Sequence, residues 1–277
     1  MLSAMAVGDE AIRFDRVSFA FDDNVVLRDV SFSIARGAMK ILFGPSGSGK
    51  SVVLKLILGL LRPDSGAIWI NGEEINGMSE AELMRVRADI GMLFQETALF
   101  DSLTVAENVG YRLYEETKMP LEDVRRRVEE VLGFVSLAPF IDRKPSELSG
   151  GQRRRVGIAR AIASSPKLLL FDDPTSGLDP ITAVTVDNEI VKLRDQQHVT
   201  SIVATHQIRD AYYVASSGTR DIAAGVPIPP AVYEQADQAT FMLLHEGRVY
   251  FDGTAEELRH TTDPYLKEFL FMTLPPW

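Results

Sequence analysis

The residues from Gly44 to Ser51, GPSGSGKS, restrict the possible folds of this chain more than any other stretch. They follow the short apolar run MKILF (39–43) and open the segment KSVVLKLILGLL (50–61), which reads as a helix. The pattern G-x-x-x-x-G-K-[ST] between a buried strand and a helix is typical of a loop that binds phosphate. The sequence therefore predicts an α/β fold with a phosphate site where this strand ends.

The chemistry of the loop suits the triphosphate of a nucleotide. Glycines let backbone N–H groups turn inward around phosphate oxygens, and the N-terminus of the helix adds the positive end of its dipole. Lys50 can reach the β- and γ-phosphates, and the Ser51 hydroxyl can bind Mg²⁺. A chance glycine-rich turn is the alternative, and the flanking strand and helix argue against it. The predicted nucleotide-binding residues here are Gly44, Pro45, Ser46, Gly47, Ser48, Gly49, Lys50 and Ser51.

Other apolar runs predict a mostly parallel sheet around this strand. Strand–helix–strand units with short connections form parallel sheets, and a helical block inserted among them should form a subdomain on one side. The further strands are expected at 11–21, 26–34, 90–94, 168–171 and 200–205, with a hairpin at 241–253 that turns at Glu246-Gly247. The expected divisions are a flexible leader at 1–10, a nucleotide-binding domain at 11–258 with a helical subdomain at about 100–165 and an insert at about 216–238, and a C-terminal tail at 259–277.

Two adjacent aspartates follow the apolar run at 168–171. Asp172 stands where a P-loop fold places the carboxylate that holds Mg²⁺. An N-cap aspartate is the alternative interpretation, and the proline and turn that follow argue against it. The sequence therefore predicts a metal site between the 44–51 loop and Asp172.

Composition excludes several other kinds of function. Cysteine is absent, so neither a disulfide framework nor a thiolate metal site is possible. The formal net charge of −10 argues against a general nucleic-acid binder. No apolar run approaches the ~20 residues needed to span a bilayer, and the first residues do not read as a signal peptide.

The pentapeptide LSGGQ (148–152) points to a family. Together with the 44–51 loop, Gln95 after one predicted strand and His206 after another, it resembles the nucleotide-binding subunit of ABC transporters over about residues 12–258. The resemblance implies ATP and Mg²⁺ as cofactors, and ATP hydrolysis as the activity. It also implies the ABC ATPase fold, a P-loop NTPase with a RecA-like core, an antiparallel β subdomain and an inserted helical subdomain.

The resemblance implies roles for residues within one chain. Phe21 would stack on adenine, Gln95 would contact Mg²⁺ and the attacking water, and His206 would contact the γ-phosphate. Each residue alone has a simpler interpretation: Phe21 as a strand core residue, Gln95 as surface polar and His206 as a helix cap. The predicted metal ligands are Ser51, Gln95 and Asp172, and the predicted catalytic residues are Lys50, Gln95, Asp173 and His206.

A second set of residues is implied to act across a dimer of this chain. Ser149, Gly150 and Gly151 would close over the γ-phosphate of ATP bound to a second copy, and Asp179 would lie at the subunit boundary. Because Ser149 begins a predicted helix, its N–H groups and dipole would form a second anion cradle. The residues that follow, Arg153, Arg154 and Arg155, are expected on a solvated helix face, or against the dimer partner, rather than on nucleic acid.

Asp173 departs from the family pattern, in which this position is normally a glutamate that polarises the attacking water. Aspartate keeps the charge but reaches less far by one methylene, roughly 1.5 Å. Misplacement on that scale can cost about 10²-fold in rate. We expect a working ATPase with slowed turnover, and a nucleotide-gated clamp with little turnover is an alternative.

A looser resemblance concerns the transported substrate. The stretch ETALFDSLTVAENVGY (96–111), the run GLDPIT and the tail DPYLKEFL are similar to the ATPases of Mce-type lipid transporters, which include the Mla phospholipid system. This implies a membrane permease near Leu99 and Phe100, an Mce-domain lipid-binding protein as a further partner, and a cytoplasmic position on the inner face of the membrane. The alternative is the ATPase of an amino-acid or other small-solute importer.

Overall fold

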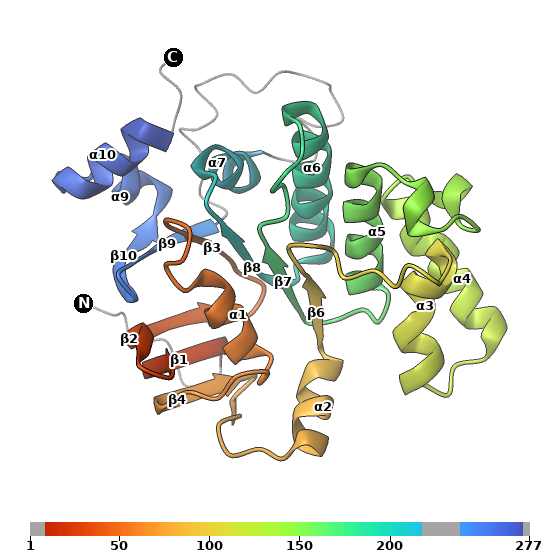
Figure 1. The fold of residues 1–277 in the computed structure, drawn as a ribbon, viewed down its shortest axis with the longest axis horizontal. Helices are drawn as coiled ribbons and strands as arrows, with labels where there is room; N and C mark the ends of the chain where they lie inside the picture. Colours follow the sequence, from red (N-terminus) through yellow and green to blue (C-terminus); the bar gives the residue numbers. More distant parts are fainter. Residues whose placement is uncertain (1–8, 218–238, 274–277) are drawn as a thin grey trace.

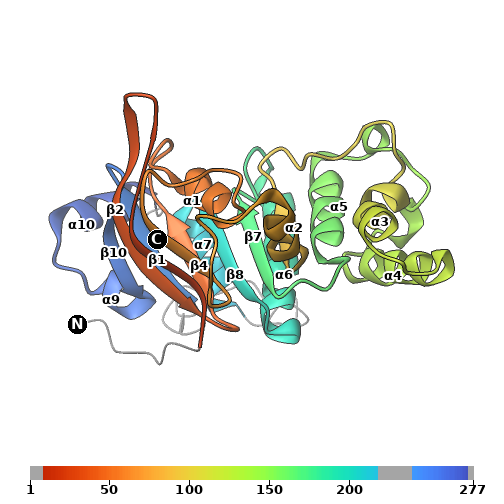
Figure 2. The same ribbon diagram turned by 90° about the horizontal axis from the view of Figure 1, so that it is seen from below.

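The computed structural model describes residues 9–217 and 239–273. Most of the predicted leader, nearly all of the predicted insert at 216–238 and the last residues of the predicted tail lie outside these ranges. The described chain forms two sheets and a group of helices, arranged along the longest axis of the molecule (Figures 1 and 2). None of the helices in these ranges is long and apolar enough to cross a membrane.

The first sheet is antiparallel and has the strand order β2-β1-β4-β5. Its apolar residues form one core cluster with α1 (Lys50–Ile57) and one face of the larger sheet, so α1 is packed between the two sheets. The predicted antiparallel β subdomain is confirmed. Its strands are β1 (Glu10–Phe21), β2 (Asn24–Ala35), β4 (Ser65–Ile70) and β5 (Glu73–Glu74).

The second sheet has the order β10-β9-β3-β8-β7-β6 and is parallel except for β10, which pairs antiparallel with β9. Strands β3, β7 and β8 are buried along their whole length, as expected for a sheet covered on both faces. Its strands are β3 (Met39–Phe43), β6 (Ile90–Leu93), β7 (Leu168–Asp172), β8 (Thr200–Thr205), β9 (Ala239–His245) and β10 (Arg248–Thr254). The hairpin turns at Glu246 (φ 48°) and Gly247 (φ 74°), as predicted.

The other face of this sheet is covered by α6 (Pro180–Gln197) and α7 (Ile208–Ser216), whose buried residues belong to the second core cluster. The helices α9 (Ala255–Arg259) and α10 (Pro264–Thr273) follow the hairpin. In α10, Leu266 is buried, and Phe269 and Leu270 pack against the core.

The inserted helices α3 (Val105–Glu116), α4 (Leu121–Phe134) and α5 (Gly150–Ile162) lie together beyond β6, at the opposite end of the molecule from α10 (Figures 1 and 2). The helix α2 (Glu80–Ala88) starts with a capping box, in which Glu82 accepts from the backbone N–H and the hydroxyl of Ser79. The 44–51 loop thus leads into α1, which lies between the two sheets, while the LSGGQ segment starts α5 in the inserted group.

One predicted boundary was wrong: α1 ends at Ile57 and not at residue 61. Gly59 adopts φ 61°, and two N–H groups beyond the helix bond back to it, Gly59 N to Leu56 O at 3.0 Å and Leu60 N to Lys55 O at 2.9 Å. This pair of bonds is the Schellman motif, which ends a helix at a glycine. The apolar periodicity of LILGLL continues past this stop and therefore concealed it.

Candidate functional site

The loop from Gly44 to Ser51 has the backbone form that a phosphate cradle requires. Gly44, Gly47 and Gly49 adopt φ values of 147°, 80° and 103°, which side chains rarely allow. A Cβ at Gly49 would lie 2.7 Å from Leu27 Cδ2, and a Cβ at Gly44 would collide with the Leu244 carbonyl. Glycine is therefore required at Gly44 both by conformation and by space, and at Gly49 chiefly by conformation.

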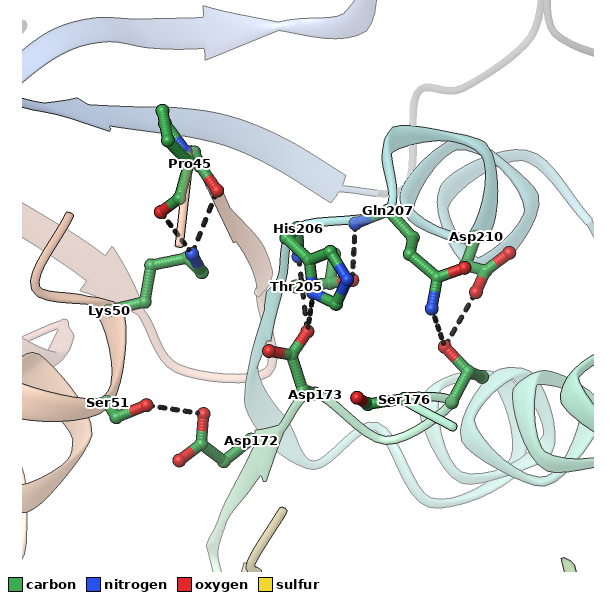
Figure 3. A network of polar contacts seen from close by, with 12 residues as sticks. Pro45, Lys50, Ser51, Asp172, Asp173, Ser176, Thr205, His206, Gln207 and Asp210 are labelled. Atoms are coloured by element: carbon green, nitrogen blue, oxygen red, sulfur yellow. Dashed lines mark hydrogen bonds and ion pairs between the residues drawn. The ribbon is translucent and has the colours of Figure 1, made fainter. Parts of the chain in front are cut away.

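Lys50 is buried at the start of α1, with 7% of its surface exposed. Its Nζ donates to the carbonyl oxygens of Gly44 at 2.8 Å and Pro45 at 2.9 Å, across the mouth of the loop (Figure 3). Burial lowers the pKa of Lys50, while the charges of Asp173 and Asp172 act in the opposite direction. The ammonium group is thus held near both aspartates, at the position predicted for β- and γ-phosphate binding.

Asp172 ends β7 beside the loop, and its Oδ1 accepts a hydrogen bond of 2.9 Å from the Ser51 hydroxyl (Figure 3). Burial raises the pKa of Asp172, and the bond from Ser51 opposes that shift. A hydroxyl and a carboxylate side by side fit the oxygen ligands that Mg²⁺ prefers. Within residues 9–217 and 239–273, no group of three or more His, Cys, Asp or Glu side chains could hold a metal. The hydroxyl of Ser51 and the carboxylate of Asp172 suit an Mg²⁺ ion that is bound partly by phosphate oxygens.

Asp173 and His206 are brought together by the sheet. Strands β7 and β8 are parallel neighbours with Asp172 opposite Ala204, so both loops leave the same edge. Asp173 Oδ1 accepts from the backbone N–H of His206 at 3.1 Å and lies 2.9 Å from His206 Nδ1 (Figure 3). Gln207 is the N-cap residue of α7, so the helix-cap interpretation of His206 was wrong. Asp173 itself has φ 46°, a left-handed conformation that aspartate tolerates better than most residues.

Phe21 and Gln95 both present exposed side chains. Phe21 ends β1, is 48% exposed and meets Phe19 edge-on with ring centroids 4.8 Å apart. Its interpretation as a strand core residue was therefore wrong, and an exposed ring is what base stacking would need. Gln95 directly follows Phe94 beyond β6 and is exposed. The functional roles of both residues stay predictions.

The LSGGQ segment starts α5 with a capping box. Ser149 accepts from Gln152 N at 3.2 Å, and the Gln152 side chain accepts from Ser149 N at 2.8 Å. Ser149 and Gly150 are exposed, whereas Gly151 is buried against Thr182 of α6. The N–H groups of a helix start are thus presented at the surface, the geometry that an anion site needs.

Asp179 is the N-cap residue of α6, and its Oδ1 accepts from Ile181 N and Thr182 N, each at 3.1 Å. These bonds lower the pKa of the carboxyl group. The contact between Gly151 and Thr182 places this helix start beside that of α5. Asp179 therefore caps α6 within its own chain. Its role at a subunit boundary stays a prediction.

The prediction that the arginines of α5 form a solvated face was wrong. Arg154 is only 6% exposed and donates to backbone carbonyls of two loops. Arg153 and Arg155 are partly buried and donate to the carbonyls of Leu148 at 2.6 Å and Val135 at 2.9 Å. All three guanidinium groups are engaged within the chain, and Arg154 was missed because its partners are remote in the sequence.

A polar network next to Asp173 and His206 was also not predicted from the sequence. The Thr175 hydroxyl donates to Asp210 Oδ2 at 2.6 Å, and Gln207 Nε2 donates to the Thr175 hydroxyl at 3.4 Å (Figure 3). These contacts join the loop after Asp173 to the start of α7. The sequence holds no motif that predicts them.

Comparison with protein families gives a match to the model described as ABC transporter, over residues 27–176. The protein TRIGALACTOSYLDIACYLGLYCEROL 3, chloroplastic, of Arabidopsis thaliana is 35% identical over 90% of this chain and 70% of its own length. The methionine import ATP-binding protein MetN of Carboxydothermus hydrogenoformans is 45% identical over 65% of this chain and 53% of its own length. A probable amino-acid ABC transporter ATP-binding protein, y4tH of Sinorhizobium fredii, is 38% identical over 91% and 93%.

Solved structures give a matching result. MJ0796, a bacterial ABC transporter cassette with a dimeric structure, aligns with a TM-score of 0.74 and 30% identity over 88% of this chain and 98% of its own. A second dimeric structure of MJ0796, in a post-hydrolysis state bound to ADP and Pi, has a TM-score of 0.73. The cbiO1 protein of Clostridium perfringens, part of the transporter complex cbiONQ, has a TM-score of 0.76 and 26% identity over 96% of each chain.

Proposed function

Because the chain belongs to the ABC transporter family and is an ATP-hydrolysing subunit of such a transporter, we propose that it powers the movement of a lipid across or between membranes. The observation that carries the proposal is the match over 90% of the chain to a relative whose name contains that of a galactolipid. The similarity of the 96–111 segment and the tail to Mce-type ATPases supports the same substrate class.

An amino acid is the second candidate substrate, favoured by the matches to MetN and y4tH. The two candidates are separated by reconstituting the chain with its permease in phospholipid vesicles. Lipid transport predicts ATP-dependent movement of a labelled phospholipid and no stimulation of hydrolysis by methionine or other amino acids. Stimulation by an amino acid with a stationary phospholipid would replace the lipid proposal.

For hydrolysis, we assign the triphosphate to the 44–51 loop and Mg²⁺ to Ser51 and Asp172, with Gln95 as a further ligand. When bound, the ion would neutralise charge on the phosphate oxygens. Lys50 holds the β- and γ-phosphates, Asp173 orients the attacking water, and His206 contacts the γ-phosphate. The bonds between Asp173 and His206 support this assignment, because they fix a carboxylate and an imidazole beside each other at one sheet edge.

A second copy of the chain would complete each site. The exposed start of α5 at Ser149 and Gly150 would approach the γ-phosphate bound to the partner, with Asp179 nearby. The dimeric structures of MJ0796 support this assembly. The assembly would sit on the cytoplasmic face of the membrane through a permease, with an Mce-domain protein as a further partner.

The reach of Asp173 is tested by lengthening it. Asp173→Glu should raise kcat by about tenfold, or about 1.4 kcal/mol of barrier, because the added methylene brings the carboxylate closer to the attacking water. The change should appear in kcat rather than in KM, since the contact matters mainly in the transition state. Steady-state ATPase assays of the assembled transporter measure it, with the exposed Asp142→Glu as the matched control. A lower kcat would mean that the backbone around Asp173 has adapted to the shorter side chain.

The permease is expected to dock near an exposed aromatic pair beyond the Gln95 loop. Phe100 and Tyr111 are 45% and 41% exposed, with ring centroids 4.7 Å apart, while Leu99 is partly buried against the core. Exposed apolar patches often mark interfaces. Replacing Phe100 and Tyr111 with aspartate should therefore abolish co-purification with the permease and leave ATP affinity unchanged. Leu60→Asp, at a residue that is 51% exposed just beyond the end of α1, is the control. Retained co-purification of the double variant would move the interface elsewhere.

A further inference from the structure

Arg154 connects three parts of the chain with one side chain. Its Nη1 donates to the backbone carbonyls of Phe94, at 3.2 Å, and Gln95, and its Nη2 donates to the carbonyl of Ser176 at 3.0 Å. Phe94 and Gln95 belong to the loop after β6, and Ser176 belongs to the loop that begins at Asp173. One buried guanidinium group thus joins α5 to the two loops that carry proposed catalytic residues.

The helix α5, which carries Arg154, packs closely against the end of β6. A Cβ at Gly157, one turn further along α5, would lie 2.6 Å from Leu93 Cδ1, so a larger residue there would force the Leu93 side chain to shift. A second arginine of α5, Arg160, donates to the carbonyls of Ala98 at 2.6 Å and Thr97 at 2.5 Å. Two arginines of α5 therefore bind backbone carbonyls of the loop after β6, while Gln95 in the same loop is exposed.

The chemistry of these contacts requires arginine. Burial lowers the pKa of Arg154, the charges of Asp173 and Asp172 oppose that shift, and a guanidinium stays protonated in proteins. Its planar fork presents donors in several directions and can serve carbonyls of separate loops at once. A lysine would keep the charge at this place, but its single nitrogen could not span all three oxygens.

We propose that Arg154 is a positioning residue for ATP hydrolysis, which fixes the backbone of Gln95 relative to the loop of Asp173 and ties both to the helix that starts at Ser149. The loops of Gln95 and Asp173 supply groups to the proposed site of this chain, so their relative placement sets the geometry of the attacking water. The helix start at Ser149 supplies groups to the site of the partner copy. A misplacement of about 1 Å can cost about 10²-fold in rate. This inference rests on the proposed roles of Gln95 and Asp173.

Arg154→Lys tests the bridging role because it keeps the charge and removes the fork. The expected result is a fall in kcat of tenfold or more, on the order of one misplaced catalytic contact, with KM for ATP within about twofold of native. Arg155→Lys is the matched control, since it makes the same change on the same helix at a residue that donates to Val135 instead. The control should keep kcat within about twofold of native.

Amide hydrogen exchange provides a readout that needs no catalysis. In Arg154→Lys, exchange should quicken in both 94–98 and 173–178, and it should be unchanged in Arg155→Lys. Unchanged exchange in either loop, an unchanged kcat, or a loss of ATP affinity that parallels the loss of kcat would each overturn the proposal. If the lysine variant does not fold, Arg154→Gln is judged by the same criteria. The proposed function is tested separately with Arg154 unchanged: it fails if Asp173→Asn hydrolyses ATP at the native rate.

Discussion

ATP affinity is expected to fall by about a hundredfold or more, about 2.7 kcal/mol, when Lys50 is replaced by alanine. The ammonium is buried at the mouth of the 44–51 loop, where its partners are the carbonyls of Gly44 and Pro45. A triphosphate in this loop would gain charge-assisted hydrogen bonds from Lys50, and alanine supplies none. Titration calorimetry with ATP and Mg²⁺ measures the change directly.

Lys55→Ala is the matched control for this experiment, because Lys55 lies on the same helix with an exposed side chain. Its removal should change ATP affinity by less than about twofold. Thermal unfolding of both variants would show that the fold is retained. An affinity of Lys50→Ala within about twofold of native would contradict the assignment of the phosphate site.

Hydrolysis is expected to fall by at least about a hundredfold in Asp173→Asn, with ATP affinity retained. An asparagine oxygen can still accept the backbone N–H of His206, which Asp173 Oδ1 accepts at 3.1 Å. The substitution therefore removes the carboxylate charge while keeping its main structural contact. Because ATP would still bind but would not be cleaved, the variant should also accumulate as a dimer during size exclusion with ATP and Mg²⁺.

The exposed Asp142→Asn is the control for charge loss and should hydrolyse ATP at the native rate. An Asp173→Asn variant with native turnover would remove Asp173 from the mechanism. Water activation would then be reassigned, with His206 and Gln95 as the next candidates. A monomeric variant with normal hydrolysis would contradict the composite site.

Several features of the fold were predictable because their signals are local. The buried strand, loop and helix around Lys50 follow from one contiguous motif, and the turn at Glu246-Gly247 follows from a two-residue pattern with positive φ. The capping box at Ser79 depends on a spacing of three residues. Each of these features depends on residues that lie close to one another in the sequence.

Features that depend on partners remote in the sequence were not predictable. Arg154 has the polarity and spacing of a surface residue, and only the meeting of α5 with two loops supplies the carbonyls that allow its burial. The Asp173–His206 pair requires β7 and β8 to be adjacent, and the sheet order 10-9-3-8-7-6 is not contained in any single motif. Both residues were identified, but the bond between them came only from the topology.

The burial of Gly151 against Thr182 affects how sequence variants of the LSGGQ segment can be interpreted. A methyl group at Gly151 would collide with the Thr182 side chain inside the same subunit, so a harmful substitution there could act without touching any nucleotide. At Gly150, an added Cβ would have one neighbouring atom within 4 Å, Leu178 Cδ2 at 3.4 Å, which is an ordinary contact. A substitution at Gly151 therefore tests the packing of α5 on α6, and only a substitution at Gly150 tests the proposed contact with a second copy.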